Sequence, residues 1–101
     1  MSQAAVEIPK SAIEAFCQKW KIGEFSLFGS ILREDFGPDS DVDVLIEFSV
    51  EADWSLYEWV EMKEELERLF GRKVDLVAKE GLRNPFRRKA ILSSREVLYA
   101  A

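Results

Sequence analysis

The strand predicted between Asp41 and Phe48 places acidic residues in an apolar run, and this restricts the fold more than any other feature of the chain. Side chains alternate between the two faces of a strand, so Asp41 and Asp43 share a face, about 7 Å apart. Like charges this close destabilise a fold unless a cation neutralises them. The other face is apolar and predicts a buried side, formed by Val42, Val44 and Ile46.

Two further features belong with these carboxylates. Asp75 is a polar residue in another apolar run, the strand predicted at 73–78. Gly29 follows a predicted strand and permits a sharp turn and close approach of a ligand, and Ser30 begins a helical turn whose N–H groups and hydroxyl suit a phosphate. Taken singly, each aspartate is better explained as a turn cap, a solvated side chain or an ion-pair partner. Taken together, the residues favour a two-metal phosphoryl or nucleotidyl transfer site with Mg²⁺ as the preferred cation.

Composition limits the other possibilities. The chain has 101 residues, so we expect a single domain over 1–101. Histidine is absent, which excludes His bases and His metal ligands. The lone Cys17 indicates a reducing compartment, and no apolar run reaches the length of a membrane span. We therefore expect a cytoplasmic protein with no membrane association. The net charge of −5 argues against direct nucleic-acid binding.

Apolar residues at helical spacing after Pro9 predict a first helix, with Ser11 as its cap and Gly23 as its stop. Alternation of polar and apolar residues then predicts a strand at 24–28. A short helical turn is expected at 30–33. The apolar stripe of this first helix consists of Ile13, Phe16, Cys17 and Trp20.

Ser55 and the glutamate three residues later have the spacing of a capping box, which predicts a helix over 55–70 with Gly71 as its stop. After the strand at 73–78, Asn84-Pro85 predicts the start of a last helix. The order is helix, strand, strand, helix, strand, helix. We therefore expect an α/β (α+β) domain, a small mixed β-sheet with helices packed on one side.

Gly29-Ser30, Asp41-Val42-Asp43 and the third aspartate in Lys73-Val74-Asp75-Leu76-Val77 together resemble the DNA polymerase β-like nucleotidyltransferase superfamily. The small size is similar to its minimal nucleotidyltransferase (MNT) branch. Arg33 and Ser40 match further positions of that signature. The tail is also similar to that of the branch, in Leu82-Arg83-Asn84-Pro85-Phe86 and Val97-Leu98-Tyr99.

The resemblance implies a polymerase β-like fold and a catalytic, metal-binding set of Asp41, Asp43 and Asp75 that holds two Mg²⁺ ions. It implies ATP as the substrate, bound by Gly29, Ser30, Arg33 and Ser40. It also implies an antitoxin that transfers AMP to a tyrosine hydroxyl of a partner HEPN-domain toxin.

Two other functions stay open. A non-catalytic antitoxin would neutralise a toxin by complex formation, and the acidic Glu34-Asp35 pair near the phosphate site favours it mildly. The second open function is a nucleotidyltransferase that modifies a small molecule. Larger members of the superfamily with that activity use an additional domain to bind the acceptor, which makes this function the least favoured.

Two side-chain groups have alternative explanations. Trp54 and Trp59 could anchor a partner, but core packing is the more frequent role. One basic cluster could hold triphosphate or a partner, although a solvated helix face is more common. It consists of Arg83, Arg87, Arg88 and Lys89.

Overall fold

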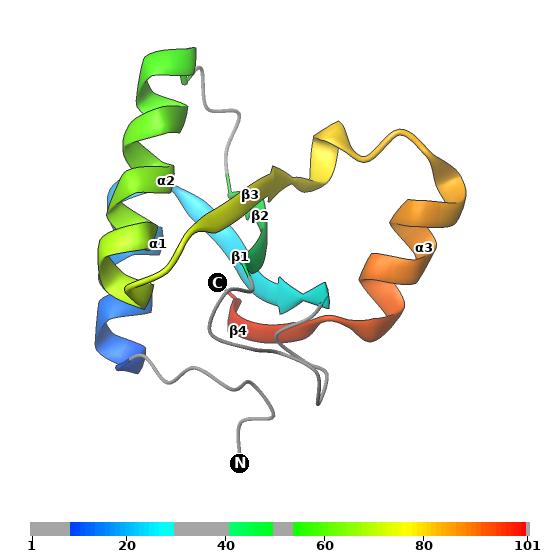
Figure 1. Cartoon of the computed structure of the whole chain (residues 1–101), viewed down its shortest axis with the longest axis horizontal. Helices are drawn as coiled ribbons and strands as arrows, with labels where there is room; N and C mark the ends of the chain where they lie inside the picture. The colour runs from blue at the N-terminus through cyan, green and yellow to red at the C-terminus, as the bar shows by residue number, and fades with distance from the viewer. Residues whose placement is uncertain (1–8, 30–40, 50–53, 101) are drawn as a thin grey trace.

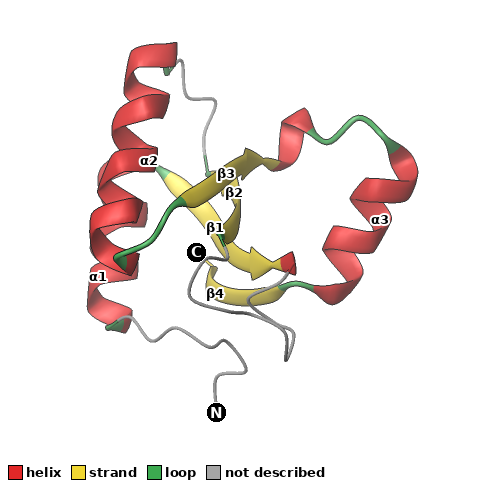
Figure 2. Cartoon of the chain, in the orientation of Figure 1, coloured by secondary structure: helices red, strands yellow, loops and turns green. Residues whose placement is uncertain are grey.

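A computed structural model of the chain describes residues 9–29, 41–49 and 54–100. In these residues, helix α1 (Lys10–Trp20) leads into strands β1 (Ile22–Phe28) and β2 (Val42–Phe48), then helix α2 (Leu56–Phe70) and strand β3 (Val74–Ala78). A 3-10 turn η2 (Lys79–Gly81), helix α3 (Pro85–Ser94) and strand β4 (Glu96–Ala100) follow. The expected α/β class is confirmed (Figure 1, Figure 2).

The strands form one mixed sheet in the order β3-β2-β1-β4. Strand β1 is antiparallel to both β2 and β4, whereas β2 and β3 are parallel. A parallel pair needs a crossover connection, and α2 supplies it. The interior position of β2 explains why its apolar residues are so fully buried.

The main core lies between the sheet and the two longer helices. α1 contributes Phe16 and Cys17, α2 contributes Met62 and Leu66, and β1 contributes Phe25, all of which are buried. Trp54 and Trp59 are partly buried and pack against this core, so their core role is confirmed.

Helix α3 lies on the other side of the sheet (Figure 1). Its Ile91 is buried with Phe28, Leu45 and Leu82 in a second cluster. The expectation that helices pack on one side of the sheet therefore holds for α1 and α2. Helix α3 differs, because it covers part of the opposite face.

The boundaries of α1 differ from the prediction. The N-cap is Pro9, without a side-chain cap bond, and Ser11 lies inside the helix. The helix ends at Lys21 in the left-handed conformation (φ 59°). Gly23 lies in β1, where an added Cβ would be 3.1 Å from the Cα of Ser49. This glycine therefore serves close approach of two backbones and does not stop the helix.

The predicted helix at 55–70 agrees with α2 to within one residue. Ser55 and Glu58 form the capping box, with Ser55 Oγ accepting from the Glu58 N–H. Gly71 ends the helix in the left-handed conformation. Strand β4 was not among the predicted elements, because Val97, Leu98 and Tyr99 are only exposed or half-buried and show little alternation.

The capping box gives a stability prediction. Ser55→Ala removes the side-chain acceptor of the Glu58 N–H, so we expect a loss of about 1 kcal/mol in the free energy of unfolding. Ser11→Ala is the matched control and should be neutral or slightly stabilising, because Ser11 caps nothing. Urea unfolding of both variants measures the difference. Equal effects would contradict the assignment of Ser55 as the cap.

Cys17 gives a second prediction. The residue is fully buried, and burial raises the pKa of its thiol from 9.0 to about 12. At pH 8 the reactive thiolate is then about 10⁻⁴ of the population. Ellman's reagent should label the folded chain very slowly and the chain in guanidinium chloride at once. Stability should also fall from pH 9 toward 12, where only the unfolded thiol ionises, and Cys17→Ala should lessen that fall.

Candidate functional site

Gly29 and Asp43 lie in contact where β1 ends. Phe28, the last residue of β1, is the register partner of Asp43 on β2. Gly29 then takes a positive φ of 75°, which favours glycine. A Cβ at Gly29 would collide with the Oδ2 of Asp43 and lie 3.2 Å from its Cγ. The absence of a side chain at position 29 therefore makes room for this carboxylate.

Asp43 and Asp75 are neighbours across the parallel pair of strands. The register places Asp43 beside Asp75 and Leu45 beside Val77. Register partners in neighbouring strands share a face and lie about 5 Å apart at their Cα atoms. Asp43 is half-buried and Asp75 is exposed. The structure thus brings two of the three predicted aspartates and Gly29 together on the face opposite α1 and α2.

Asp41 lies immediately before β2 and is exposed. The next residue anchors this point of the chain, because the N–H of Val42 donates to the carbonyl of Lys73 over 2.9 Å. Among residues 9–29, 41–49 and 54–100, no group of three acidic, Cys or His side chains is close enough to hold a metal ion. A metal set of all three aspartates stays a prediction.

The remaining predicted nucleotide-binding residues lie outside the described part of the chain. These are Ser30, Arg33 and Ser40, together with the Glu34-Asp35 pair.

The floor of the site is apolar. Phe28 and Leu45 are buried on the same face as Asp43 and pack with Leu82 and Ile91. Sequence reasoning did not single out Phe28, although its position directly before Gly29 is the signal that could have identified it. A buried apolar floor beside carboxylates lowers the local dielectric and strengthens their interaction with a bound charge.

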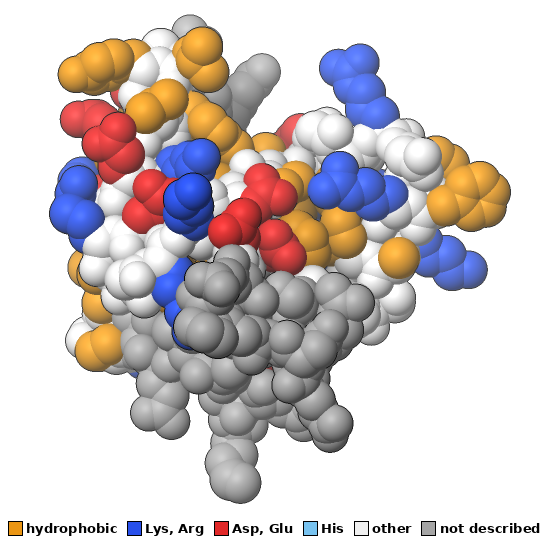
Figure 3. Space-filling model, viewed as in Figure 1, with side chains coloured by type: hydrophobic (Ala, Val, Ile, Leu, Met, Phe, Trp, Pro, Cys, Tyr) orange, Lys and Arg blue, Asp and Glu red, His pale blue; other side chains and the backbone are white. Residues whose placement is uncertain are grey.

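Helix α3 closes one side of this face. It starts where predicted, at Pro85, and Asn84 caps it: Asn84 Oδ1 accepts from the N–H groups of Phe86 (3.0 Å) and Arg87 (3.1 Å). Figure 3 shows acidic side chains gathered over the strands and Arg and Lys side chains over α3, with hydrophobic side chains between them.

No helix in the described residues is long and apolar enough to cross a membrane.

Comparison with known proteins agrees with this geometry. The family profile of the nucleotidyltransferase domain matches residues 9–98. Protein adenylyltransferase MntA of Thermococcus cleftensis is 38% identical over 82 residues, which are 81% of this chain and 78% of that protein.

Solved structures share the fold. A protein provisionally identified as a minimal nucleotidyltransferase superposes with a TM-score of 0.70 and 31% identity, over 86% of each chain. A complex of a tri-AMPylated Shewanella oneidensis HEPN toxin with its MNT antitoxin gives a TM-score of 0.65 at 17% identity, over 91% of this chain and 70% of that one. At that identity the second match shows the fold alone. The expected resemblance is confirmed: the chain belongs to the nucleotidyltransferase domain family, in its minimal nucleotidyltransferase branch.

Proposed function

We propose that this chain transfers AMP from ATP to a hydroxyl, most simply a tyrosine hydroxyl, of a partner HEPN-domain toxin, and so acts as an antitoxin in the cytoplasm. Three facts support the proposal. The chain is a nucleotidyltransferase, a relative of 38% identity is named a protein adenylyltransferase, and an MNT antitoxin of the same fold is found with an AMPylated HEPN toxin.

The observation that supports the chemistry best is the placement of Asp43 against Gly29 and beside Asp75. A nucleotidyl transfer needs a binding place for the phosphates next to carboxylates that orient the attacking hydroxyl and accept its proton. Gly29 gives the backbone access that a phosphate requires. As part of this proposal, Ser30, Arg33 and Ser40 bind the nucleotide.

The carboxylates have separate roles. In the proposed reaction the acceptor oxygen attacks the α-phosphorus, a P–O bond forms, and the bond to the β-phosphate breaks to release pyrophosphate. Asp75 is exposed and therefore open to an incoming protein, so we assign it the acceptance of the hydroxyl proton. Asp43 is half-buried and its carboxylate lies against Gly29, which suits a residue that orients the nucleotide.

The donor set also fits Mg²⁺, because these are carboxylate oxygens on one open sheet face. Asp43 and Asp75, with Asp41, would hold the two proposed ions. Bound there, Mg²⁺ would stabilise the negative charge that develops on the phosphates and favour deprotonation of the hydroxyl.

The first test is transfer of label. Wild-type protein incubated with Mg²⁺, α-phosphate-labelled ATP and the HEPN-domain product of its adjacent gene should label that product. Asp43→Asn and Asp75→Asn should each lower the rate by at least about 100-fold, since each removes a carboxylate charge that the proposed reaction uses. Gel autoradiography and mass spectrometry measure the rate and identify the acceptor.

Glu47→Gln is the matched control on the same face of β2. Its carboxylate pairs with Lys79 over 2.9 Å and is remote from Gly29 in the strand, so the variant should keep near-normal transfer. One outcome would refute the proposed AMP transfer: the toxin is neutralised without becoming labelled, and Asp43→Asn neutralises it as well as wild type does. That result would establish an antitoxin that acts by binding.

Gly29→Ala provides a second test of the same geometry. The new Cβ would collide with the Asp43 carboxylate, and the positive φ adds about 1 kcal/mol of strain. We expect a folded protein with transfer reduced by about tenfold or more. Gly81→Ala is the control, because a Cβ there meets nothing within 4 Å. Circular dichroism checks folding, and unchanged transfer by Gly29→Ala would contradict the proposed role of this contact.

A further inference from the structure

The surface of α3 has a charge opposite to that of the chain as a whole. The net charge of the protein is −5, yet residues 81–95 contain no acidic side chain and five basic ones. Arg95 is half-buried and forms an ion pair with Glu24 at 2.7 Å. The other four are exposed: Arg83, Arg87, Arg88 and Lys89.

Two basic residues elsewhere in the described part of the chain form ion pairs with carboxylates. Lys79 pairs with Glu47 at 2.9 Å and Lys19 with Glu65 at 3.1 Å. Within the part of the chain that the structure describes, Arg88 and Lys89 have no carboxylate partner. Their positive charge is therefore available to an anion from outside.

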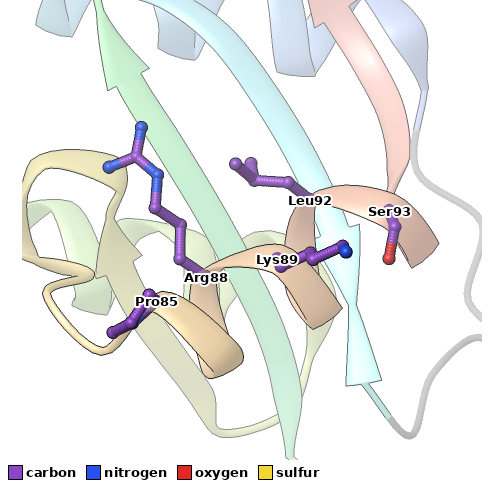
Figure 4. A pocket seen from close by; sticks show the side chains of 5 residues that line it. All are labelled: Pro85, Arg88, Lys89, Leu92 and Ser93. Carbon is purple, nitrogen blue, oxygen red and sulfur yellow. The ribbon is translucent and has the colours of Figure 1, made fainter.

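Arg88 and Lys89 border an open hollow of about 480 Å³ on one face of α3. Figure 4 shows Arg88 and Leu92 on one side of α3, while Lys89 leaves the helix in another direction. Leu92 is half-buried and supplies an apolar wall, and the stem of Arg88 lies one turn before it. Apolar walls around a guanidinium strengthen its attraction for an anion. The lining residues are Pro85, Arg88, Lys89, Leu92 and Ser93.

This face of α3 adjoins the face of the sheet that bears the aspartates. Arg88 lies three residues before Ile91 and four before Leu92, so the three share a helix side. Ile91 is buried with Phe28 and Leu45, and Leu92 packs against the same cluster. Phe28 and Leu45 belong to the sheet face of Asp43. Arg88 is thus on the side of α3 that turns toward the carboxylate face.

We infer that Arg88, supported by Lys89, binds the polyphosphate of the nucleoside triphosphate. The inference rests on the proposed function for the identity of the ligand. Carboxylates alone repel the β- and γ-phosphates, and a cation nearby offsets that repulsion. Arginine presents a planar fork of donors that matches phosphate oxygens in pairs. A polyphosphate fits better than an acidic protein, because Arg88 lies on the side of α3 that packs on the carboxylate face of the sheet.

The test measures binding and not transfer. Isothermal titration calorimetry at low salt gives the affinity of the full chain for MgATP and, separately, for inorganic tripolyphosphate. Arg88→Gln should weaken both ligands by about tenfold, and Lys89→Gln by less. Arg88→Lys should be intermediate, since it keeps the charge and loses the fork. Arg68→Gln is the control, because Arg68 is an exposed cation in the last turn of α2, away from this face.

The outcomes separate this inference from the proposed function. Arg88-dependent binding of tripolyphosphate by a protein that labels no partner supports the phosphate site and refutes the transfer. Equal affinities of Arg88→Gln and wild type for both ligands would overturn the site and leave the transfer standing. If Arg88→Gln loses binding of the partner protein but keeps its nucleotide affinity, the inference is also overturned. In that case α3 binds an acidic protein and not the polyphosphate. Absence of tripolyphosphate binding by wild type would overturn it too.

Discussion

The parallel pairing of β2 with β3 is the constraint on which both the fold and the site depend. It places Val42 beside Val74 and Asp43 beside Asp75, so apolar and acidic pairs alternate between the two faces of the sheet. The valines lie in the core with α1 and α2. A shift of β3 by one residue against β2 would turn the Asp75 carboxylate into that core, where burial of an unpaired charge is very costly. The pairing that buries the core therefore also assembles the site.

Much of this arrangement could be predicted from the sequence because it depends on local patterns. The capping box at Ser55 and the stop at Gly71 are short-range signals, and both hold in the structure. The alternation around Asp43 fixes which residues share a face before any partner strand is known. The contact of Gly29 with Asp43 was not predictable in the same way, since it depends on the register of β1 against β2.

The features that sequence reasoning missed depend on distant parts of the chain. Glycine is a common residue at the end of a helix, so Gly23 was predicted as a stop. In the structure it instead leaves room for the backbone of Ser49, which follows β2. Strand β4 has weak alternation and is stabilised by pairing with β1 and by the ion pair of Arg95 with Glu24. The position of α3 against the opposite face follows from Ile91 packing on Phe28 and Leu45. None of these contacts is visible in a local window of sequence.

The placement of α3 bears on the anion binding that we propose for this acidic protein. Charges separated by more than about 10 Å are largely screened at physiological salt, so a bound phosphate responds mainly to its immediate neighbours. The acidic residues of α2 lie across the sheet from the Asp43 face, whereas Arg88 lies on the side of α3 that packs on it. The buried contact of Ile91 keeps this side of α3 against the sheet. The proposed anion binding therefore depends on which helix covers which face, and the net charge of −5 does not exclude it.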